Sequence, residues 1–406
     1  MIDQINEKIN TDLNDEFHEY RQDSFIQFMR HPPQAYKDSP TRARYIEFTE
    51  DDIQKMILGN YGGKSSYPPG KDKDVYVIDG NVYVNGKKSV IVKPMKLAEK
   101  EDHGLLQKYM DIEYSDDRIE YLINAGWQNG MFMHIPDKSR IRLTIENVSN
   151  ASYSFAMKDV IIIGDDSDVE IQCSDTNYGD GNGVQGRNIY IFMGKRSKLV
   201  YSRIQDKSMS VRGATFMKVH MDDFSEATIF HTDHGFEHSI LSTESYQYGT
   251  GTKYEVRGAS FTDNDQQADI RDSTVQIGTG TVSNIIIRGI VKGKSVTMQR
   301  GNIDLREESK KSQGYYDTRI LLLSKEAFAN TKPALLINNN DTKSKHASAI
   351  SDIDEESLFY LGSRGISRET AKSMIISGFV ESVMEGADES MRNAVLKFSN
   401  LNETFD

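Results

Sequence analysis

Cysteine and long apolar runs are almost absent from this sequence. Its 406 residues include one cysteine, Cys173, which excludes an internal disulfide framework. No apolar run approaches the roughly 20 residues that a membrane-spanning helix needs. Residues 1–10 are polar and acidic, unlike a signal peptide. We therefore expect a cytoplasmic protein with no membrane partner.

Positively charged residues are also fewer than negatively charged ones. The chain has 49 Lys and Arg against 61 Asp and Glu, a formal net charge of −12. Because phosphate binding needs a positive field, nucleic acid is excluded as a partner, and an anionic membrane surface is disfavoured for the same reason. The length exceeds that of a usual single core, so we expect two or three structural regions.

Residues 1–125 form the first region, which we expect to be mixed and largely helical. Residues 51–58 are typical of a short helix with acids in its first turn. Residues 75–86 predict a β-hairpin with Asp79 and Gly80 at its turn. The loop 59–65 is similar to a phosphate-binding loop, but its glycine spacing is one residue short and prolines follow. A plain loop is the better interpretation.

From about Met131 the pattern changes to short β-branched or aromatic runs roughly every ten residues. The predicted strands are 141–145, 160–163, 169–172, 189–192, 199–202, 227–231, 254–257, 275–277, 285–287 and 295–298. The glycines expected at turns are Gly164, Gly194, Gly213, Gly258, Gly280, Gly289 and Gly293. No helical period intervenes, which disfavours parallel βα units. A β-sandwich and a β-solenoid both fit this pattern.

Three histidines, His231, His234 and His238, follow one another closely and are compatible with a metal site. Because side chains alternate sides along a strand, only some could converge, so solvated turn histidines are the better prediction. Residues 175–183 are similar to a calcium loop but lack its closing glutamate, so we expect a glycine-rich surface loop.

Cys173 alternates with Val169 and Ile171, which predicts a small core residue. No Lys, Arg or His adjoins it in sequence to lower its pKa, so a role as a sulfur carrier is disfavoured.

Residues 346–406 are expected to be helical. Ser351, with Asp354 three residues on, predicts a helix start, and Gly365 predicts its end. Leu358, Phe359 and Leu361 are expected on one face of this helix. Ser367 predicts the cap of a second helix, whose apolar positions are Ala371, Met374, Ile375, Phe379, Val380 and Val383. A strand at 334–337 and a polar loop holding His346 would precede this helical hairpin.

The C-terminal part of the chain resembles the C-terminal signature of the SufB/SufD family, which works in iron–sulfur cluster assembly. The matching residues are 346–356, 358–361, 363–367, Ala371 and 374–379. A second match, 129–136, resembles the strand that enters the family's central domain. The resemblance implies a right-handed parallel β-helix at 126–345, flanked by helical regions at 1–125 and 346–406. The terminal hairpin would cap the stack.

Within the family the chain resembles the SufD-like branch. In that branch a histidine at the place of His346 is implicated in cluster formation at the interface with SufB. The SufB-like branch has a cysteine where this chain has Tyr316, and a glutamate where it has Ala347. The resemblance thus implies a subunit that is not an enzyme and holds no cofactor stably alone. His346 would be a candidate ligand of a transient iron–sulfur cluster.

The resemblance also implies partners. These are a SufB-like subunit or a second copy of the chain, and a SufC-like ABC ATPase. The side chains expected to dock the ATPase are Leu358, Phe359, Tyr360, Ile366 and Met374. Two alternatives stay open. One is a homodimeric scaffold acting with the ATPase alone. The other is a β-helix carbohydrate-active enzyme using acids such as Asp165, Asp166, Asp168, Asp263 and Asp265.

Overall fold

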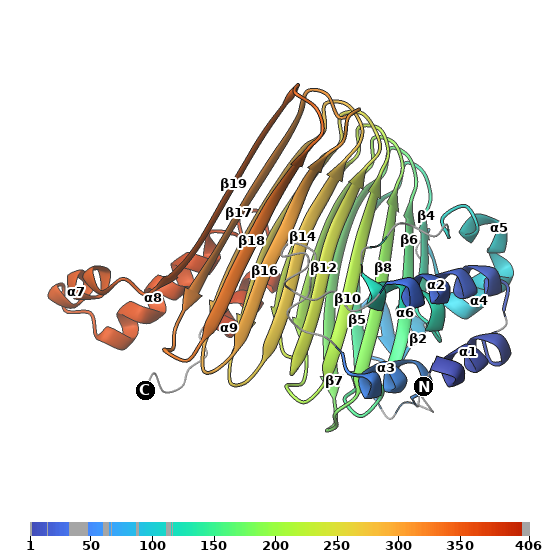
Figure 1. Cartoon of the computed structure of the whole chain (residues 1–406), viewed down its shortest axis with the longest axis horizontal. Coiled ribbons are helices and arrows are strands. Elements are labelled where there is room, and N and C mark those ends of the chain that lie inside the picture. The colour runs from blue at the N-terminus through green and yellow to red at the C-terminus, as the bar shows by residue number, and fades with distance from the viewer. Residues whose placement is uncertain are drawn as a thin grey trace.

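A parallel β-solenoid of about eight turns forms the centre of the molecule, with helices at both ends (Figure 1). The computed structural model describes residues 2–13, 15–31, 48–59, 65, 67–86, 89–110, 115 and 117–399. The protein is 46% strand and 23% helix, so the predicted mainly β class is confirmed, and of the two predicted architectures the solenoid is the one formed.

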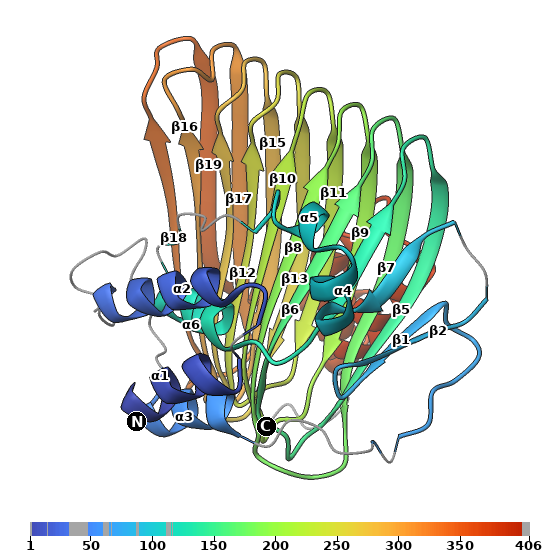
Figure 2. The ribbon, with the colours of Figure 1, turned by 90° about the vertical axis from the view of Figure 1, so that its right-hand side faces the viewer.

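Each turn of the solenoid adds one strand to each of two sheets. The strands are β4 (Met131–Ile135), β5 (Arg140–Asn150), β6 (Phe155–Ile163), β7 (Asp168–Tyr178), β8 (Val184–Met193), β9 (Lys198–Asp206), β10 (Arg212–Met221), β11 (Glu226–His234), β12 (His238–Gln247), β13 (Lys253–Thr262), β14 (Gln267–Gln276), β15 (Val282–Val291), β16 (Val296–Leu305), β17 (Ser312–Leu322), β18 (Phe328–Ile337) and β19 (Thr342–Asp352). Odd-numbered strands pair in parallel in one sheet and even-numbered strands in the other, which Figure 2 shows as successive rungs.

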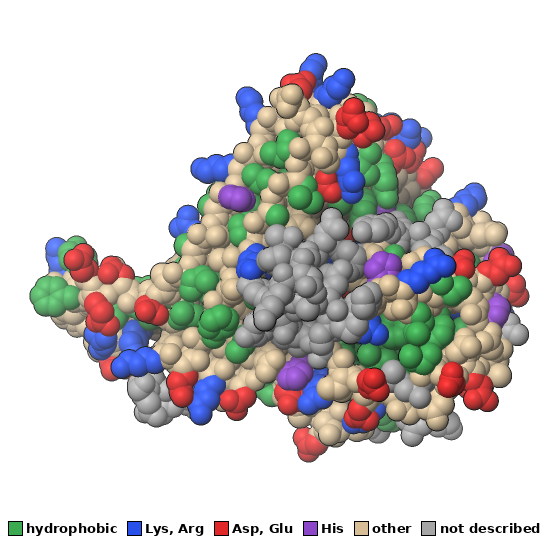
Figure 3. Space-filling view, viewed as in Figure 1, with side chains coloured by type: hydrophobic (Ala, Val, Ile, Leu, Met, Phe, Trp, Pro, Cys, Tyr) green, Lys and Arg blue, Asp and Glu red, His purple; other side chains and the backbone are tan. Residues whose placement is uncertain are grey.

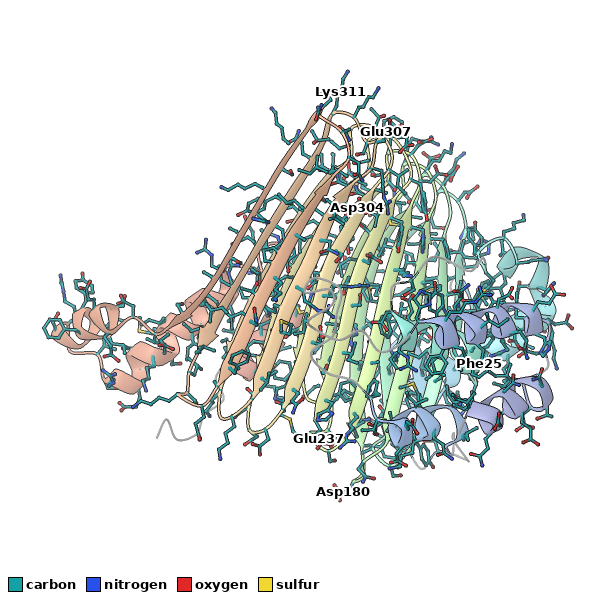
Figure 4. All side chains as sticks on the ribbon, in the orientation of Figure 1. Phe25, Asp180, Glu237, Asp304, Glu307 and Lys311 are labelled. Atoms are coloured by element: carbon teal, nitrogen blue, oxygen red, sulfur yellow. The ribbon has the colours of Figure 1, made fainter. Side chains whose placement is uncertain are left out.

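The corner between the two sheets repeats the same backbone conformation from turn to turn. At the corner that follows each even-numbered strand from β4 to β16, one residue has a positive φ; these residues are Lys138, Asp166, Arg196, Phe224, Gly251, Gly280 and Lys311. Each donates its backbone N–H to a carbonyl of the next corner, as Arg196 does to Asp223 at 2.9 Å. Figure 4 shows Lys311 at this edge, with Asp180 and Glu237 at the opposite edge. The hydrogen-bond ladder therefore continues around the corner.

Side chains that point into the lumen alternate with those that point outward, so one face of each strand builds the core. Buried lumen residues include Ile145, Ile171, Ile191, Val219, Ile229, Val256, Ile285 and Ile303. Gly213, Gly258 and Gly289 lie within strands, so the prediction that they form turns is wrong. A Cβ on Gly258 would lie 2.3 Å from His231 Nε2, and one on Gly213 would lie 2.2 Å from the Phe236 ring. These glycines make room for large neighbours.

The N-terminal region covers one end of the solenoid and the outer face of the even-numbered sheet around β6 and β8 (Figure 1). Its elements are α1 (Ile2–Thr11), α2 (His18–Arg30), α3 (Glu50–Leu58), β1 (Val75–Ile78), β2 (Asn81–Val84), β3 (Ile91–Pro94), α4 (Met95–Glu101), α5 (His103–Leu106) and α6 (Arg118–Gly126). The predicted hairpin is confirmed as β1 and β2, with Asp79 and Gly80 both at positive φ. Most of the loop 59–65 lies outside the described residues.

The C-terminal boundary differs from the prediction. His346 lies within β19 rather than in a loop after the last strand, and the solenoid continues past residue 345 to Asp352. Every residue of β19 is paired with β17, and this backbone ladder outweighs the helix signal at Ser351. The helix α7 (Glu355–Ser363) is capped by Asp354 instead. The end at Gly365 and the Ser367 cap of α8 (Arg368–Glu381) are confirmed, and α9 (Glu389–Ser399) follows.

Candidate functional site

The solenoid ends at β18 and β19, each of which is the terminal strand of its sheet among the described residues. A terminal strand leaves backbone donors and acceptors on one side without a strand partner. Large apolar side chains are also exposed on these two strands, namely Phe328, Leu336, Ile337 and Ile350. The next rung that would cover them is missing from the described chain. We call β18 and β19 together the open end.

His346 lies on this open end, at the mouth of the lumen. It is in register with Tyr316 on β17, which is in register with Ile285 on β15. Residues in register share a face of the sheet, so the exposed His346 continues an inward-facing column. Tyr316 is buried behind it, with its ring so close to Gly301 that a Cβ there would lie 2.4 Å away. Burial raises the pKa of Tyr316 well above its ordinary value.

Charged side chains are buried inside the lumen. They are Asp159, Asp175, Arg187, Arg203, Lys207, His231, Asp233 and Asp272. Arg187 binds Asp159, Lys207 lies 2.5 Å from Asp175, and Arg203 lies 3.1 Å from Asp233. Each cation therefore has a carboxylate partner, as buried charges require. The prediction of a surface loop at 175–183 is wrong for residues 175–178, which belong to β7, and Asp175 among them faces the lumen.

His231 and His234 lie in β11 and His238 begins β12, so the prediction of three solvated turn histidines is wrong. His231 is buried. Its Nδ1 lies 2.6 Å from Asp233 and its Nε2 lies 3.2 Å from Asp272. Burial lowers the pKa of His231, but the two carboxylates outweigh it and raise this pKa to about 10. His234 instead stacks on Phe398, with ring centroids 4.6 Å apart. Among the described residues, no group of three or more His, Cys, Asp or Glu could hold a metal ion.

Cys173 is buried in the lumen, which confirms the prediction of a core position. It accepts a hydrogen bond from Asn147 Nδ2 at 3.1 Å. Burial raises the pKa of its thiol, although Arg187 and Arg203 oppose this effect. Sequence reasoning missed both arginines because they come from neighbouring strands, β8 and β9, rather than from adjacent residues.

The helix α7 and the start of α8 project from the solenoid, and we call them the arm (Figure 1). Hydrophobic side chains lie at its tip (Figure 3). Phe359, Tyr360 and Met374 are 80%, 58% and 51% exposed. Leu358 is buried, so its predicted place on a docking surface is wrong, as is its predicted common face with Phe359. Ile366 is half-buried. A groove of about 1150 Å³ lies between the arm and the solenoid.

A family model identifies the family of this chain. The family model described as "SUF system FeS cluster assembly, SufBD core domain" matches residues 145–379, more than half of the chain. The chain belongs to the SufBD family. The match covers most of the solenoid, the open end and the arm, so the open end and the arm are parts of the SufBD core domain.

Three SufBD relatives are similar over different lengths. A Synechocystis protein is 36% identical over 136 residues, which are 34% of this chain and 28% of that protein. A chloroplastic Arabidopsis thaliana protein is 26% identical over 312 residues, 73% of this chain and 56% of its own length. A Staphylococcus epidermidis protein is 22% identical over 307 residues, which are 73% of this chain and 65% of that protein. All three are named iron-sulfur cluster assembly SufBD family proteins, and the chain spans less than two thirds of each.

Several acids that a carbohydrate-active enzyme would use have structural partners at the turns. Asp165 accepts the backbone N–H of Lys195 at 2.8 Å, and Asp166 binds Arg196 at 2.6 Å. Asp263 accepts the backbone N–H of Asn264 at 2.7 Å.

No helix in the described part of the chain is both long and apolar enough to cross a membrane.

The first prediction concerns His231. Replacing it with glutamine removes the cation between Asp233 and Asp272; Asp233 keeps Arg203, but the buried Asp272 loses this cation. We expect the free energy of unfolding to fall by about 3–5 kcal/mol, as when one partner of a buried pair is removed. Urea unfolding at pH 7 measures this change. The exposed His346→Gln is the control, with a change within about 0.5 kcal/mol.

The pH dependence of the free energy of unfolding provides a second test of the role of His231. The folded pKa of about 10 lies above the ordinary value of 6.5, so protonation of His231 favours the fold. This contribution is complete below pH 6.5 and is lost as the pH rises through 10. We expect the decline between pH 6.5 and 9 to be shallower in His231→Gln. Identical slopes in the two proteins would show that His231 is not charged in the fold.

Proposed function

We propose that this chain is a SufD-like, non-enzymatic subunit of a SUF-type complex that assembles iron–sulfur clusters. The observation that carries the proposal is an exposed imidazole, His346, at the mouth of the lumen on a terminal strand. The names of the SufBD relatives support a role in iron–sulfur cluster assembly. The SufD-like assignment rests on Tyr316 and Ala347, which replace the cysteine and glutamate of the SufB-like branch.

The open end would pair with a SufB-like solenoid. A partner strand that adds to β19 would satisfy its backbone groups and cover Ile350, and a strand that adds to β18 would cover Ile337. A second copy of this chain would fit the same edge chemistry and would make a homodimeric scaffold. Co-purification from the native cell distinguishes these two partners, and we expect a SufB-like subunit.

An iron–sulfur cluster would be cargo at this interface rather than a resident cofactor. Imidazole and thiolate are the ligands that iron takes in such clusters. His346 offers the imidazole, and the partner would offer thiolates. Cys173 is on β7, six strands from β19 in the same sheet, so roughly 30 Å separates the two residues at about 4.8 Å per strand. This cysteine therefore belongs to the lumen and not to the cluster site.

The arm would dock a SufC-like ABC ATPase, which would supply ATP binding to the complex. Phe359, Tyr360 and Met374 present apolar surface on a projecting pair of helices, and exposed aromatic residues are frequent anchors at interfaces. This surface is separate from the open end, so one chain could contact both partners at once.

The second prediction tests the arm. We expect Tyr360→Asp to abolish pull-down of the ATPase, because the substitution puts a charge into an apolar interface. Since Tyr360 is 58% exposed, the chain should keep its circular dichroism spectrum and melting temperature. The matched control is Tyr83→Asp on β2, an exposed tyrosine at the other end of the solenoid, which should bind normally. Normal binding by Tyr360→Asp would place the docking surface elsewhere.

The third prediction tests the cluster site. Anaerobic reconstitution of the isolated chain with iron and sulfide should leave it essentially colourless, because thiolates supply most cluster ligands. Mixed with a SufB-like subunit, it should support a cluster measured by visible absorbance. We expect His346→Ala to lower that yield and Cys173→Ser to leave it unchanged. A strongly coloured isolated chain, or an undiminished yield with His346→Ala, would contradict the proposed ligand role.

A further inference from the structure

One buried arginine fastens the N-terminal helices to the start of the solenoid. Arg21 on α2 is fully buried, and its Nη1 donates to the carbonyl oxygens of Ala125 at 3.3 Å and Trp127 at 2.9 Å. Its guanidinium lies 3.7 Å from the centre of the Trp127 ring. Trp127 lies between α6 and β4, so Arg21 joins α2 to the chain segment that enters the first rung.

Two carboxylates share this one guanidinium. Asp15 Oδ2 lies 2.6 Å from Arg21 Nη2, and Glu99 Oε1 on α4 lies 3.4 Å from the same atom. Glu99 is buried, whereas the Asp15 side chain is 21% exposed. Fully ionised, the three side chains would carry one positive and two negative charges. Burying an excess carboxylate charge is unfavourable, so one of the two carboxyls favours its protonated form.

The surroundings identify Glu99 as the group that keeps the proton. A cluster of apolar side chains packs in this region, including Phe17, Met95, Ala98, Trp127 and Phe132. Burial, followed by the charge of Asp15, raises the pKa of Glu99 to about 7, while Arg21 and Lys96 oppose the shift. A side-chain hydrogen bond between Glu99 and Asp15 contributes to raising this pKa. A protonated Glu99 can donate to the Asp15 carboxylate, which an ionised Glu99 cannot do.

We propose that Asp15, Arg21 and Glu99 form a pH-sensitive staple that holds the N-terminal helices on the solenoid and loosens when Glu99 loses its proton. The contribution of the staple is complete below pH 4.5 and is lost as the pH rises through about 7. Because α2 and α4 pack over the first rungs, its opening would change how much of the even-numbered sheet is covered at that end. This device is independent of the partners proposed for the open end and the arm.

The other titratable groups around the staple are few and can be tested separately. Lys96 is on the same helix as Glu99, and its charge lowers the pKa of Glu99. His18 is at the start of α2, and the His103 ring lies 5.0 Å from the Phe17 ring. Protonated histidines would favour an ionised Glu99, so they act against the proposed direction. His18→Gln and His103→Gln variants should therefore keep the pH response.

Amide hydrogen exchange of the full chain measures the opening of the staple directly. Exchange of peptides from α2 and α4 is compared at pH 6 and pH 8, after correction for the intrinsic effect of pH on amide exchange. With a pKa near 7 when closed and 4.5 when open, the local opening constant should rise about tenfold between these pH values. Peptides from β13 to β15 should show no such rise.

Glu99→Gln keeps the shape of the side chain and a hydrogen-bond donor but removes the titratable carboxyl group. We therefore expect the tenfold rise in the opening constant to disappear. Glu101→Gln is the matched control, because Glu101 is a half-exposed carboxylate on the same helix that pairs with Lys93. It should keep the rise. Asp15→Asn offers a second test and should reduce the rise by removing the neighbouring charge. A flat response in the unmodified chain, or an unchanged rise in Glu99→Gln, would overturn the proposal.

Discussion

Every rung of this solenoid is held by the rungs on either side of it. Parallel strands donate backbone hydrogen bonds to the strands above and below, and the corner residues repeat the pattern outside the sheets. A coil of this kind cannot complete its own ends. At the first rung the chain adds β1, β2 and β3 and the N-terminal helices. At the last rung the outer edges of β18 and β19 have no strand partner in the described chain, and His346 lies on β19.

The same constraint explains the charged lumen. Once a rung places Arg187, Arg203 or His231 inside, the charge can be compensated only by side chains of adjoining rungs or of the facing sheet. Asp159, Asp233 and Asp272 do so here. Removing one partner leaves another charge without compensation inside the coil, so these residues depend on one another across many positions in sequence. Cys173 is buried in this lumen, six strands from the open end.

The strand pattern of the solenoid could be predicted, but several of its strands could not. β12 was missed because its lumen side carries Thr243, Ser245 and Gln247, which do not alternate with apolar residues. His346 was placed in a loop because the polar sequence of β19 hides a strand that exists through pairing with β17. The caps at Gly365 and Ser367 depend on local chemistry and were predictable. The contacts of Arg21 and His231 depend on residues distant in sequence and were not.

Amide hydrogen exchange at the open end tests most directly whether this end is the partner-binding edge. The chain is measured alone and after mixing with a SufB-like subunit under conditions in which a complex forms. We expect exchange to slow in residues 342–352 of β19, whose outer edge has no strand neighbour in the described chain, and to stay unchanged in residues 81–84 of β2. A complex that forms while exchange in β19 stays the same would contradict the proposed interface.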